Sequence, residues 1–487
     1  MLINSMTNCK NFANWLFETN IANRNKLAFV DNNQSLTYGQ LENHVKMFAR
    51  QLIEANLLPQ QRIIICLGDC VEWPVFFLAA LMVGLNPVLV SADLPKKTIK
   101  HIMDLCDCSA IVTEQFENFD VKHFTKNQAL QPGPILDQFY QYHSDEPCFW
   151  LLSSGTTGEP NCLVHRHADL YNLLESVATP AYSIDSNSRI LSTAKLSFTY
   201  GFNNGITFSL GKGATTYLIN GVPAPSIIFD KINQHQITHF FTVPTIIASM
   251  LKHGQNKKLN SSVKFMVSSG EPLPKNICEK FEQQHSNTIY NCIGMSEVTQ
   301  TYCAQTPKNY ESGTVGGPLP GIECQVRDED GVVLPPGKLG ELFVKSPCAA
   351  LMYWKDWKKT KNTFVGEWVR TGDKVIETSR GNYVYISRAD DLIKINGLYV
   401  SSIEVESTIT EITGVTECAV VISTVGNFPE IHAFVVKDLD ISVGDILLEL
   451  NSCLERHKIP KKIHFIDSLP KTVTYKKQRS KLRDLVC

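Results

Sequence analysis

Residues 150–165 read WLLSSGTTGEPNCLVH, in which an apolar stretch is followed by serine, threonine and glycine. The apolar residues predict a buried strand, and the polar residues predict a loop at its end. Hydroxyl groups donate hydrogen bonds to phosphate oxygens, and glycine lets backbone N–H groups turn toward the same anion. The loop is therefore a candidate phosphate site, although an ordinary flexible loop would have the same composition. Its hydroxyl residues are Ser153, Ser154, Thr156 and Thr157, and its glycines are Gly155 and Gly158.

Two common nucleotide-binding motifs are absent from the sequence. No GxxxxGK[ST] occurs, and GVVLPPGK at residues 331–338 has the wrong spacing and lacks the hydroxyl residue. No GxGxxG follows a predicted strand either. The loop at 153–158 is therefore neither a Walker A loop nor a dinucleotide fingerprint.

The surrounding sequence alternates between short apolar runs and helical patterns. RIIICLG (62–68), NPVLVS (86–91) and SAIVTE (109–114) predict strands, and helices are expected at 73–83 and 96–106. A further helix is expected over 36–56, starting at Thr37 or Tyr38. This alternation is typical of βαβ units and a largely parallel sheet. The same alternation of strand and helix patterns occurs at 190–290, where ITHFFTVP, VKFMVSSG and NTIYNCIG predict strands.

The last part of the chain has a different pattern. Residues 311–388 are richer in glycine and proline and predict a β-rich subdomain, with strands at GELFVKS and YVYIS. A small α+β pattern follows Asp391. The fold class expected is α/β, with a large N-terminal domain of parallel-type sheets and helices, and a small α+β C-terminal domain.

Composition excludes several other classes of protein. The chain has 487 residues, 43% of them apolar and 19% charged, and its net charge of −2 gives no sign of nucleic-acid binding. The longest apolar run, Val75 to Val90, contains Gly84, Asn86 and Pro87 and is too short to span a membrane. The odd number of cysteines, 15, and the polar start predict reduced thiols in a cytoplasmic protein.

The loop is one of several segments that resemble the adenylate-forming superfamily of acyl- and aryl-CoA ligases, adenylation domains and luciferases. The segments occur in the order found in that superfamily. They are SSGTTGEP (153–160), SSGEPLP (268–274), YNCIGMSE (290–297), GELFVKSP (340–347), WVRTGDK (368–374), SRADDLIKINGLYVSSIEVE (387–406) and LPKTVTYKKQR (469–479). Residues 192–216 and 367–406 are most similar to the benzoate-CoA ligase group, as is Ile293.

The resemblance implies a reaction and a division of the chain. A carboxylate attacks the α-phosphate of ATP to give an acyl adenylate and pyrophosphate, and a thiol then displaces AMP. Residues 1–389 would form the domain that binds ATP and the acid, with the β-rich subdomain at about 311–388. Residues 390–487 would form a mobile domain, with the hinge at Asp390.

The resemblance also implies roles for single residues. Lys476 would bridge the carboxylate and the α-phosphate, Ser296 would touch the α-phosphate, and Glu297 would hold Mg²⁺. Gly397 is a candidate for the thiol tunnel. The residues expected to bind ATP are Ser153, Ser154, Gly155, Thr156, Thr157, Gly158, Gly270, Glu271, Pro272, Asn291, Asp373 and Arg388.

Some positions depart from the superfamily pattern. The phosphate loop usually carries lysine where this chain has Asn161, which could cost about 1–3 kcal/mol of phosphate stabilisation. Tyr475 replaces the glycine before Lys476, and Ser387 replaces the glycine before Arg388. His165 and His167 look like a metal pair, but one such pair is a weak signal.

An aromatic acid would need a flat slot walled by rings and aliphatic groups. The candidates are Phe198, Tyr200, Phe241, Gly270, Gln300 and Thr301. Because Gln300 and Thr301 are polar, a hydroxy- or amino-substituted aryl acid is favoured. The acceptor is expected to be CoA, with a carrier-protein phosphopantetheine as the alternative. A non-catalytic relative that binds nucleotide or acyl groups is a third possibility, and either a monomer or a homodimer is compatible with the sequence.

Overall fold

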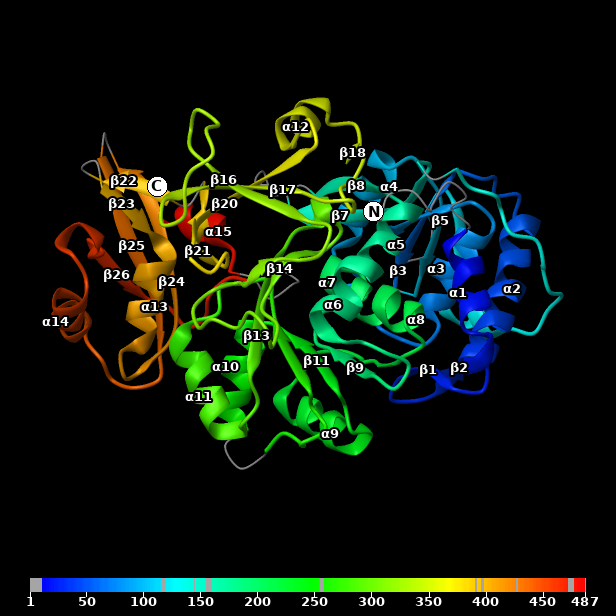
Figure 1. The fold of residues 1–487 in the computed structure, drawn as a ribbon, viewed down its shortest axis with the longest axis horizontal. Helices are drawn as coiled ribbons and strands as arrows, with labels where there is room; N and C mark the ends of the chain where they lie inside the picture. The colour runs from blue at the N-terminus through cyan, green and yellow to red at the C-terminus, as the bar shows by residue number, and fades with distance from the viewer. Residues whose placement is uncertain are drawn as a thin grey trace.

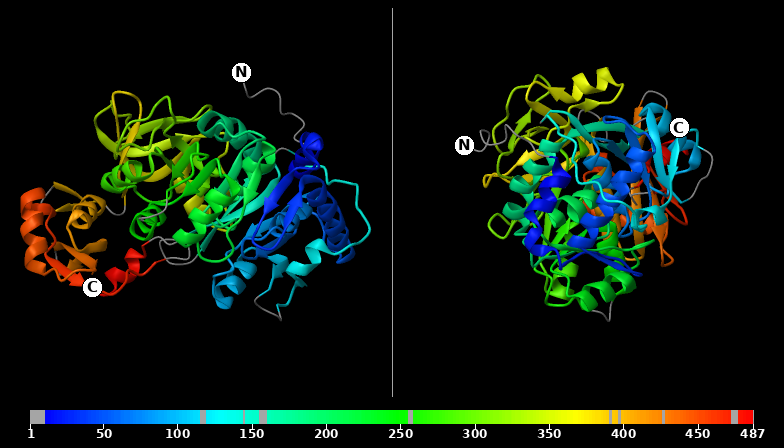
Figure 2. Two further views of the ribbon diagram at one scale, coloured as in Figure 1. Left: turned by 90° about the horizontal axis from the view of Figure 1, so that it is seen from below. Right: turned by 90° about the vertical axis from the view of Figure 1, so that its right-hand side faces the viewer.

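A computed structural model of the chain describes residues 11–114, 119–143, 145–154, 160–254, 258–389, 392–395, 398–425, 428–471 and 477–486. The first elements of the chain lie at one end of its longest axis, and the last lie at the other (Figure 1). Figure 2 shows the same separation from a second direction. The described residues form the α/β fold that the sequence predicts, with a large N-terminal part and a small α+β C-terminal part.

The strands on either side of the predicted phosphate loop lie in a seven-stranded sheet of order β18-β8-β7-β4-β3-β5-β6. Strands β3, β4, β5 and β7 pair in parallel, which confirms the βαβ interpretation of this region. β7 and β8 form an antiparallel hairpin around the predicted phosphate loop. The strands are β3 (Arg62–Cys66), β4 (Asn86–Leu89), β5 (Cys108–Thr113), β6 (Lys122–Phe124), β7 (Pro147–Ser154), β8 (Pro160–Arg166) and β18 (Met352–Tyr353).

A nine-stranded sheet of order β15-β14-β13-β12-β11-β9-β10-β1-β2 forms the second layer. Its neighbours β10, β9, β11, β12 and β13 are parallel, whereas β14 and β15 turn back antiparallel. The strands are β1 (Leu27–Val30), β2 (Ser35–Thr37), β9 (Arg189–Ser192), β10 (Thr215–Tyr217), β11 (His239–Thr242), β12 (Phe265–Ser268), β13 (Ile289–Gly294), β14 (Thr301–Ala304) and β15 (Gly317–Pro318).

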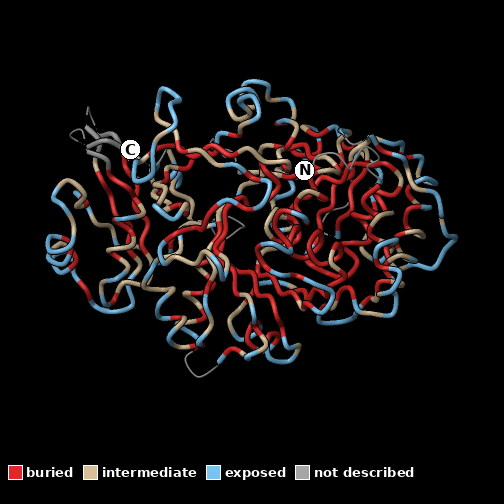
Figure 3. Tube along the Cα trace, in the orientation of Figure 1, coloured by how far each residue is buried: buried red, intermediate tan, exposed pale blue. Residues whose placement is uncertain are grey.

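Helices cover these sheets, and α3 is enclosed completely. All ten residues of α3 (Trp73–Met82) are buried, as expected for an apolar helix without a polar face. The expected helix at 36–56 is α2 (Tyr38–Glu54), whose N-terminus is capped by Thr37 and Gln40. Buried residues are concentrated around α3 and the two sheets (Figure 3). The other helices of this part are α1 (Phe12–Thr19), α4 (Lys96–Leu105), α5 (His167–Leu173), α6 (Thr179–Tyr182), α7 (Thr199–Phe202), α8 (Ser209–Gly211), α9 (Pro225–His235), α10 (Pro244–His253) and α11 (Lys275–His285).

The β-rich subdomain predicted at about 311–388 is an antiparallel sheet with one short helix beside it. Its strands β16, β17, β20 and β19 are neighbours in that order, and β21 pairs with β20. The elements are β16 (Glu323–Arg327), β17 (Leu339–Lys345), α12 (Trp357–Thr363), β19 (Phe364–Val365), β20 (Trp368–Glu377) and β21 (Tyr383–Arg388).

The C-terminal part has a small three-stranded sheet, β24-β25-β26, with helices packed against it. One apolar cluster, which includes Val405, Val420 and Ile446, joins α13, β24 and α14. The boundary predicted near residue 390 falls outside the described residues and stays a prediction. The elements are β22 (Leu392–Ile395), β23 (Leu398–Ser401), α13 (Ser402–Glu411), β24 (Val415–Val425), β25 (Phe428–Lys437), α14 (Val443–Cys453), β26 (Lys462–Phe465) and α15 (Arg479–Arg483). Among the described residues, no helix combines the length and apolar character needed to cross a bilayer.

Candidate active site

The parallel strands of the nine-stranded sheet end at one edge. Strands β9, β11, β12 and β13 pair in register, so the segments that follow them begin side by side. Ligands of open α/β sheets bind outside the carboxyl ends of the strands. The predicted residues Tyr200, Gly270, Ser296 and Glu297 all follow these strand ends in the chain. The fold therefore gathers segments far apart in sequence at a position where a ligand is expected.

Asp373 on β20 is buried, and each of its two carboxylate oxygens accepts one hydrogen bond. Its Oδ1 accepts a hydrogen bond from Arg388 Nη1 at 2.8 Å, and its Oδ2 accepts one from the Tyr302 hydroxyl at 3.0 Å. Burial raises the pKa of the Asp373 carboxyl, and the guanidinium of Arg388 opposes that effect. Because Arg388 also donates to Thr371 O at 2.9 Å, its guanidinium is held in one orientation. Asp373 and Arg388, two of the residues predicted to contact the nucleotide, thus form one ion pair.

Glu297 lies in a short 3₁₀ turn directly after β13. Its side chain is buried and accepts a hydrogen bond from the Tyr353 hydroxyl through Oε1. Burial raises the pKa of Tyr353, and the neighbouring carboxylate adds to the effect, so the phenol remains a donor. The neighbouring Ser296 Oγ lies 2.8 Å from Thr199 Oγ1 at the start of α7. A carboxylate oxygen and a hydroxyl are therefore presented on consecutive residues.

The turn after Glu297 has an unusual backbone. Thr299 has φ 69° and ψ −40°, and Gln300 N donates to Val298 O at 2.8 Å, which defines a γ-turn with positive φ. Such a conformation is strained for a β-branched residue and persists only when its surroundings hold it. Thr299 Oγ1 donates to Cys348 O at 2.8 Å and lies 3.2 Å from His165 Nδ1. His165 therefore has a structural partner here, and the described residues contain no group of three potential metal ligands.

Gly294, immediately before this turn, permits a close backbone approach. A Cβ atom at this position would lie 2.2 Å from Gln300 O. Any larger residue would therefore push β14 away from β13, where Gly294 and Thr301 are paired. The glycine of the YNCIGMSE segment is explained by this packing.

Three of the predicted acid-pocket residues are neighbours. The rings of Tyr200 and Phe241 meet edge to face with centroids 6.1 Å apart. Gln300 Nε2 donates to Tyr200 O at 3.4 Å and to Asn204 Oδ1 at 3.0 Å. Among the described residues, Gln300 Oε1 is buried and has no hydrogen-bond partner. An unpaired buried acceptor is suited to a ligand that carries a donor.

The other predicted residues have diverse surroundings. Phe198 is the N-cap residue of α7, and Thr301 is buried at the start of β14. Gly270 has φ +85°, and Glu271 Oε2 accepts from Thr245 Oγ1 at 2.6 Å, which ties its loop to α10. Of the other residues predicted to bind ATP, Pro272 is exposed, and Asn291 donates to Thr314 O at 3.3 Å.

The base of the predicted phosphate loop carries two unused polar groups. Ser153 and Asn161 are paired across the β7–β8 hairpin. Ser153 Oγ and Asn161 Nδ2 are buried, and neither has a hydrogen-bond partner in the described part of the chain. Both can donate, so the residues present are chemically suited to a phosphate group. At position 161 this chain therefore has a neutral amide in place of the ammonium group of a lysine.

Several predicted site residues fall outside what the structure describes. The side chain of Ser154 is one of them. Residues Gly155, Thr156, Thr157, Gly158, Asp390, Gly397 and Lys476 also lie outside the described ranges.

Three side chains in this region were not predicted from sequence. Tyr302 contacts Asp373 across 71 positions, Tyr353 contacts Glu297 across 56, and Thr199 contacts Ser296 across 97. Two of them had a signal, because Tyr302 follows Gln300 and Thr301 in the sequence and Thr199 lies between Phe198 and Tyr200. No local pattern singles out Tyr353.

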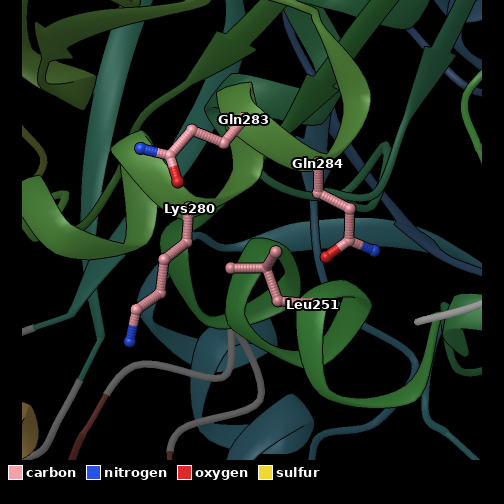
Figure 4. Close-up of a pocket in the computed structure, with 4 residues that line it drawn as sticks. All are labelled: Leu251, Lys280, Gln283 and Gln284. Atoms are coloured by element: carbon pink, nitrogen blue, oxygen red, sulfur yellow. The ribbon is translucent and has the colours of Figure 1, made fainter.

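A shallow depression on the surface lies elsewhere, between α10 and α11 (Figure 4). It is lined by Leu251, Lys280, Gln283 and Gln284. None of the residues predicted for the site is among these four. The depression has one apolar residue and no acidic one, so it does not add to the site described above.

The chain is similar to known proteins over most of its length. The model of the AMP-binding enzyme family matches residues 17–354, and that of the AMP-binding enzyme C-terminal domain matches residues 404–476. The chain is 33% identical to a benzoate–CoA ligase of Thauera aromatica, over 94% of this chain and 92% of the relative. It is 30% identical to a 4-hydroxybenzoate–CoA/benzoate–CoA ligase of Rhodopseudomonas palustris, over 94% and 91%.

A solved structure shows the same fold over nearly the full length. The crystal structure of a benzoate CoA ligase from Burkholderia xenovorans superimposes with a TM-score of 0.90 at 34% identity, covering 97% of this chain and 99% of that one. The similarity to the adenylate-forming superfamily and its benzoate-CoA ligase group, expected from the motifs, is thereby confirmed. The chain belongs to the AMP-binding enzyme family.

Proposed function

We propose that the chain is an aryl-CoA ligase that activates an aromatic carboxylic acid with ATP and transfers the acyl group to CoA. One observation carries the proposal: residues 296–302 join the three parts of the expected site. Ser296 and Glu297, proposed for phosphate and metal, lie at one end of this segment, and Ser296 contacts Thr199. Gln300 donates to the backbone of Tyr200 in the predicted acid pocket, and Tyr302 donates to Asp373, which is proposed for the ribose. A single short segment can therefore align an acid with a nucleotide.

In this proposal, the carboxylate of the acid attacks the α-phosphate of ATP and pyrophosphate leaves. The thiol of CoA then attacks the acyl carbon and AMP leaves. Asp373 would accept hydrogen bonds from the ribose hydroxyls while Arg388 fixes its orientation. Ser153 and Asn161 would donate to the phosphate chain.

The developing negative charge needs cationic partners. Mg²⁺, when bound, would neutralise phosphate charge, and Glu297 is the carboxylate proposed to hold it. Lys476 is proposed to bridge the acid and the α-phosphate. We further propose that residues 1–389 and 390–487 form two domains that re-orient about Asp390 between the two steps.

A substituted aryl acid is favoured over plain benzoate. The reason is Gln300 Oε1, which is buried without a partner among the described residues. A ring hydroxyl or amino group would supply the missing donor, and an unsubstituted ring would leave the acceptor unpaired. Of the two relatives compared above, one is a ligase for benzoate and the other a ligase for 4-hydroxybenzoate as well as benzoate.

The decisive experiment measures pyrophosphate release with a panel of benzoic, hydroxybenzoic and aminobenzoic acids, followed by thioester detection with CoA. Release of pyrophosphate and formation of an aryl-CoA would support the proposal. A thioester formed only with a phosphopantetheinylated carrier protein would replace CoA as the acceptor. Nucleotide binding without pyrophosphate release with any acid would favour the non-catalytic alternative.

The role of Gln300 can be tested by Gln300→Met, which keeps the length of the side chain and removes its acceptor. We expect kcat/KM for the preferred hydroxy- or aminobenzoate to fall about 5-fold relative to that for benzoate, equivalent to about 1 kcal/mol. Measuring both acids with the same variant controls for general damage. An equal loss for both acids would contradict the assignment of Gln300 Oε1 to the ring substituent.

A substitution at Asn161 tests the proposed contact of this residue with the phosphate chain of ATP. Asn161→Lys should lower the KM for ATP several-fold and leave the acid preference unchanged, because an ammonium contact to phosphate acts equally in the ground and transition states. Asn161→Gln is the matched control, since it lengthens the side chain without adding charge. Steady-state kinetics at varied Mg-ATP would decide. Lower activity of Asn161→Lys would mean that the surroundings of this position have been remodelled and no longer accept a cation.

A further inference from the structure

Lys359 on α12 is a half-buried lysine that lies against the aromatic ring of Tyr353. Its backbone N–H donates to Asp356 Oδ1 at 2.9 Å, which fixes the residue in the first turn of the helix. Its Nζ lies 4.4 Å from the centroid of the Tyr353 ring, at the distance of a cation–π contact. Among the described residues, no carboxylate lies within ion-pair distance of this ammonium group. Its three N–H donors therefore have no acceptor within that part of the chain.

The ring of Tyr353 also connects this lysine to the residue proposed to hold Mg²⁺. The Tyr353 hydroxyl donates to Glu297 Oε1, so one side chain contacts both Lys359 and Glu297. Burial lowers the pKa of Lys359, the carboxylates of Glu297 and Asp356 oppose that effect, and the guanidinium of Arg388 adds to it. The ammonium group is therefore within electrostatic range of two residues of the candidate site, Glu297 and Arg388.

The pairing of β18 with β8 places Tyr353 on the same face of the sheet as the base of the predicted phosphate loop. Tyr353 is paired with Leu163, and Asn161 lies two residues earlier on the same strand. Residues that are paired across strands, or two apart along a strand, point to the same face of a sheet. Because Asn161 is paired in turn with Ser153 on β7, the side chains of Tyr353, Asn161 and Ser153 share one face.

This face carries neutral donors, and the cations near it other than Lys359 already have acidic partners. Ser153 Oγ and Asn161 Nδ2 are buried and unpaired among the described residues, and both groups are uncharged. Arg388 pairs with Asp373 at 2.8 Å. Lys355, which lies between Tyr353 and α12 in the chain, pairs with Asp107 at 2.9 Å. Lys359 therefore differs from these two cations in having no acidic partner in the described ranges.

We propose that Lys359 binds the phosphate chain of ATP and supplies the positive charge that Asn161 lacks. This inference rests on the proposed function, in which Ser153 and Asn161 donate to that chain. A lysine ammonium binds phosphate as a point charge on a flexible stem, so it can reach the ligand from α12 as well as from β8. Since Ser296 is proposed for the α-phosphate, the contact of Lys359 is assigned to the two outer phosphates, which leave as pyrophosphate.

The experiment compares binding of ATP, pyrophosphate and AMP, each in the presence of Mg²⁺ and at constant ionic strength, by isothermal titration calorimetry. Lys359→Met removes the charge and keeps the length of the side chain, and Lys359→Arg keeps the charge. Lys358→Met is the matched control, because Lys358 is an exposed lysine next to Lys359 on the same helix.

We expect Lys359→Met to weaken the binding of ATP and of pyrophosphate about 10-fold, because a charged hydrogen bond to phosphate is lost. The Kd for AMP should stay within about 2-fold of the wild-type value, since AMP lacks the two outer phosphates. Lys359→Arg should bind pyrophosphate within about 3-fold of wild type, because a guanidinium also pairs with phosphate. Lys358→Met should leave all three dissociation constants unchanged.

Three results would overturn the inference. Unchanged binding of ATP and pyrophosphate in Lys359→Met would show that the ammonium makes no such contact. Equal weakening of AMP binding would assign Lys359 to the structure of the site as a whole. A loss that disappears at saturating Mg²⁺ would mean that Lys359 acts on the metal through Tyr353 and Glu297.

Failure of the proposed function would be a separate result. A wild-type protein that binds ATP and pyrophosphate but releases no pyrophosphate with any acid would lose the ligase assignment, while the same dissociation constants would still decide the role of Lys359. A wild-type protein that binds neither ATP nor pyrophosphate would overturn both proposals.

Discussion

Replacing Lys476 with alanine should cut acyl-adenylate formation about 100-fold or more, since a charged contact to the developing charge on the α-phosphate is lost. Thioester formation from supplied acyl adenylate should survive, because the second step breaks no bond to phosphorus. Pyrophosphate release and thioester formation, measured separately, test this expectation. The proposed bridging role of Lys476 predicts a large difference between them.

The matched control for this prediction is Lys481→Ala. Lys481 is an exposed lysine on α15 of the same C-terminal region, and its removal should leave both half-reactions unchanged. If Lys476→Ala lowers both half-reactions equally in a folded protein, the assignment of Lys476 to the first step is wrong. Circular dichroism of the variants would establish that they are folded.

The second large effect is expected at the proposed hinge. Asp390→Pro should keep adenylate formation and abolish thioester formation, because proline fixes φ near −65° and a hinge needs two backbone conformations. Asp390→Ala separates this backbone effect from loss of the carboxylate, since alanine leaves φ free. Both half-reactions would be measured for both variants.

Comparing the two variants at residue 390 separates an effect of the backbone from an effect of the carboxylate. If Asp390→Ala also loses thioester formation, the carboxylate rather than the backbone is responsible. If Asp390→Pro leaves the ratio of the two rates unchanged, no re-orientation about this residue is required. Either outcome would remove the basis for alternation of the two proposed domains.

The fold was largely predictable because its signals are local. The alternation of apolar runs with helical patterns at 62–114 corresponds to β3, α3, β4, α4 and β5, within a few residues at each end. Thr37 and Gln40 have the spacing of a capping box, so the start of α2 could be predicted to one residue. Each of these signals lies within one element of the chain.

The contacts that complete the site were not predictable in the same way. Tyr353 reaches Glu297 because β18 pairs with β8 in the sheet, and nothing near residue 353 in the sequence indicates that pairing. The segment 203–208 is a π-helix beside the predicted acid pocket, although its sequence NNGITF has no feature that sets it apart from an α-helix. Such features depend on the packing of distant segments.

The γ-turn at Thr299 has a consequence for how acid selectivity can change. It reverses the chain within one residue, so Glu297 and Gln300 belong to separately supported structures: Glu297 is held by Tyr353, and Gln300 is held by Tyr200 and Asn204. A substitution at Gln300 therefore perturbs contacts on α7 and its continuation, while the carboxylate of Glu297 keeps its own support. A new ring substituent can therefore be accommodated on one side of Thr299 while Glu297, the residue proposed to hold the metal ion, keeps its contact with Tyr353 on the other.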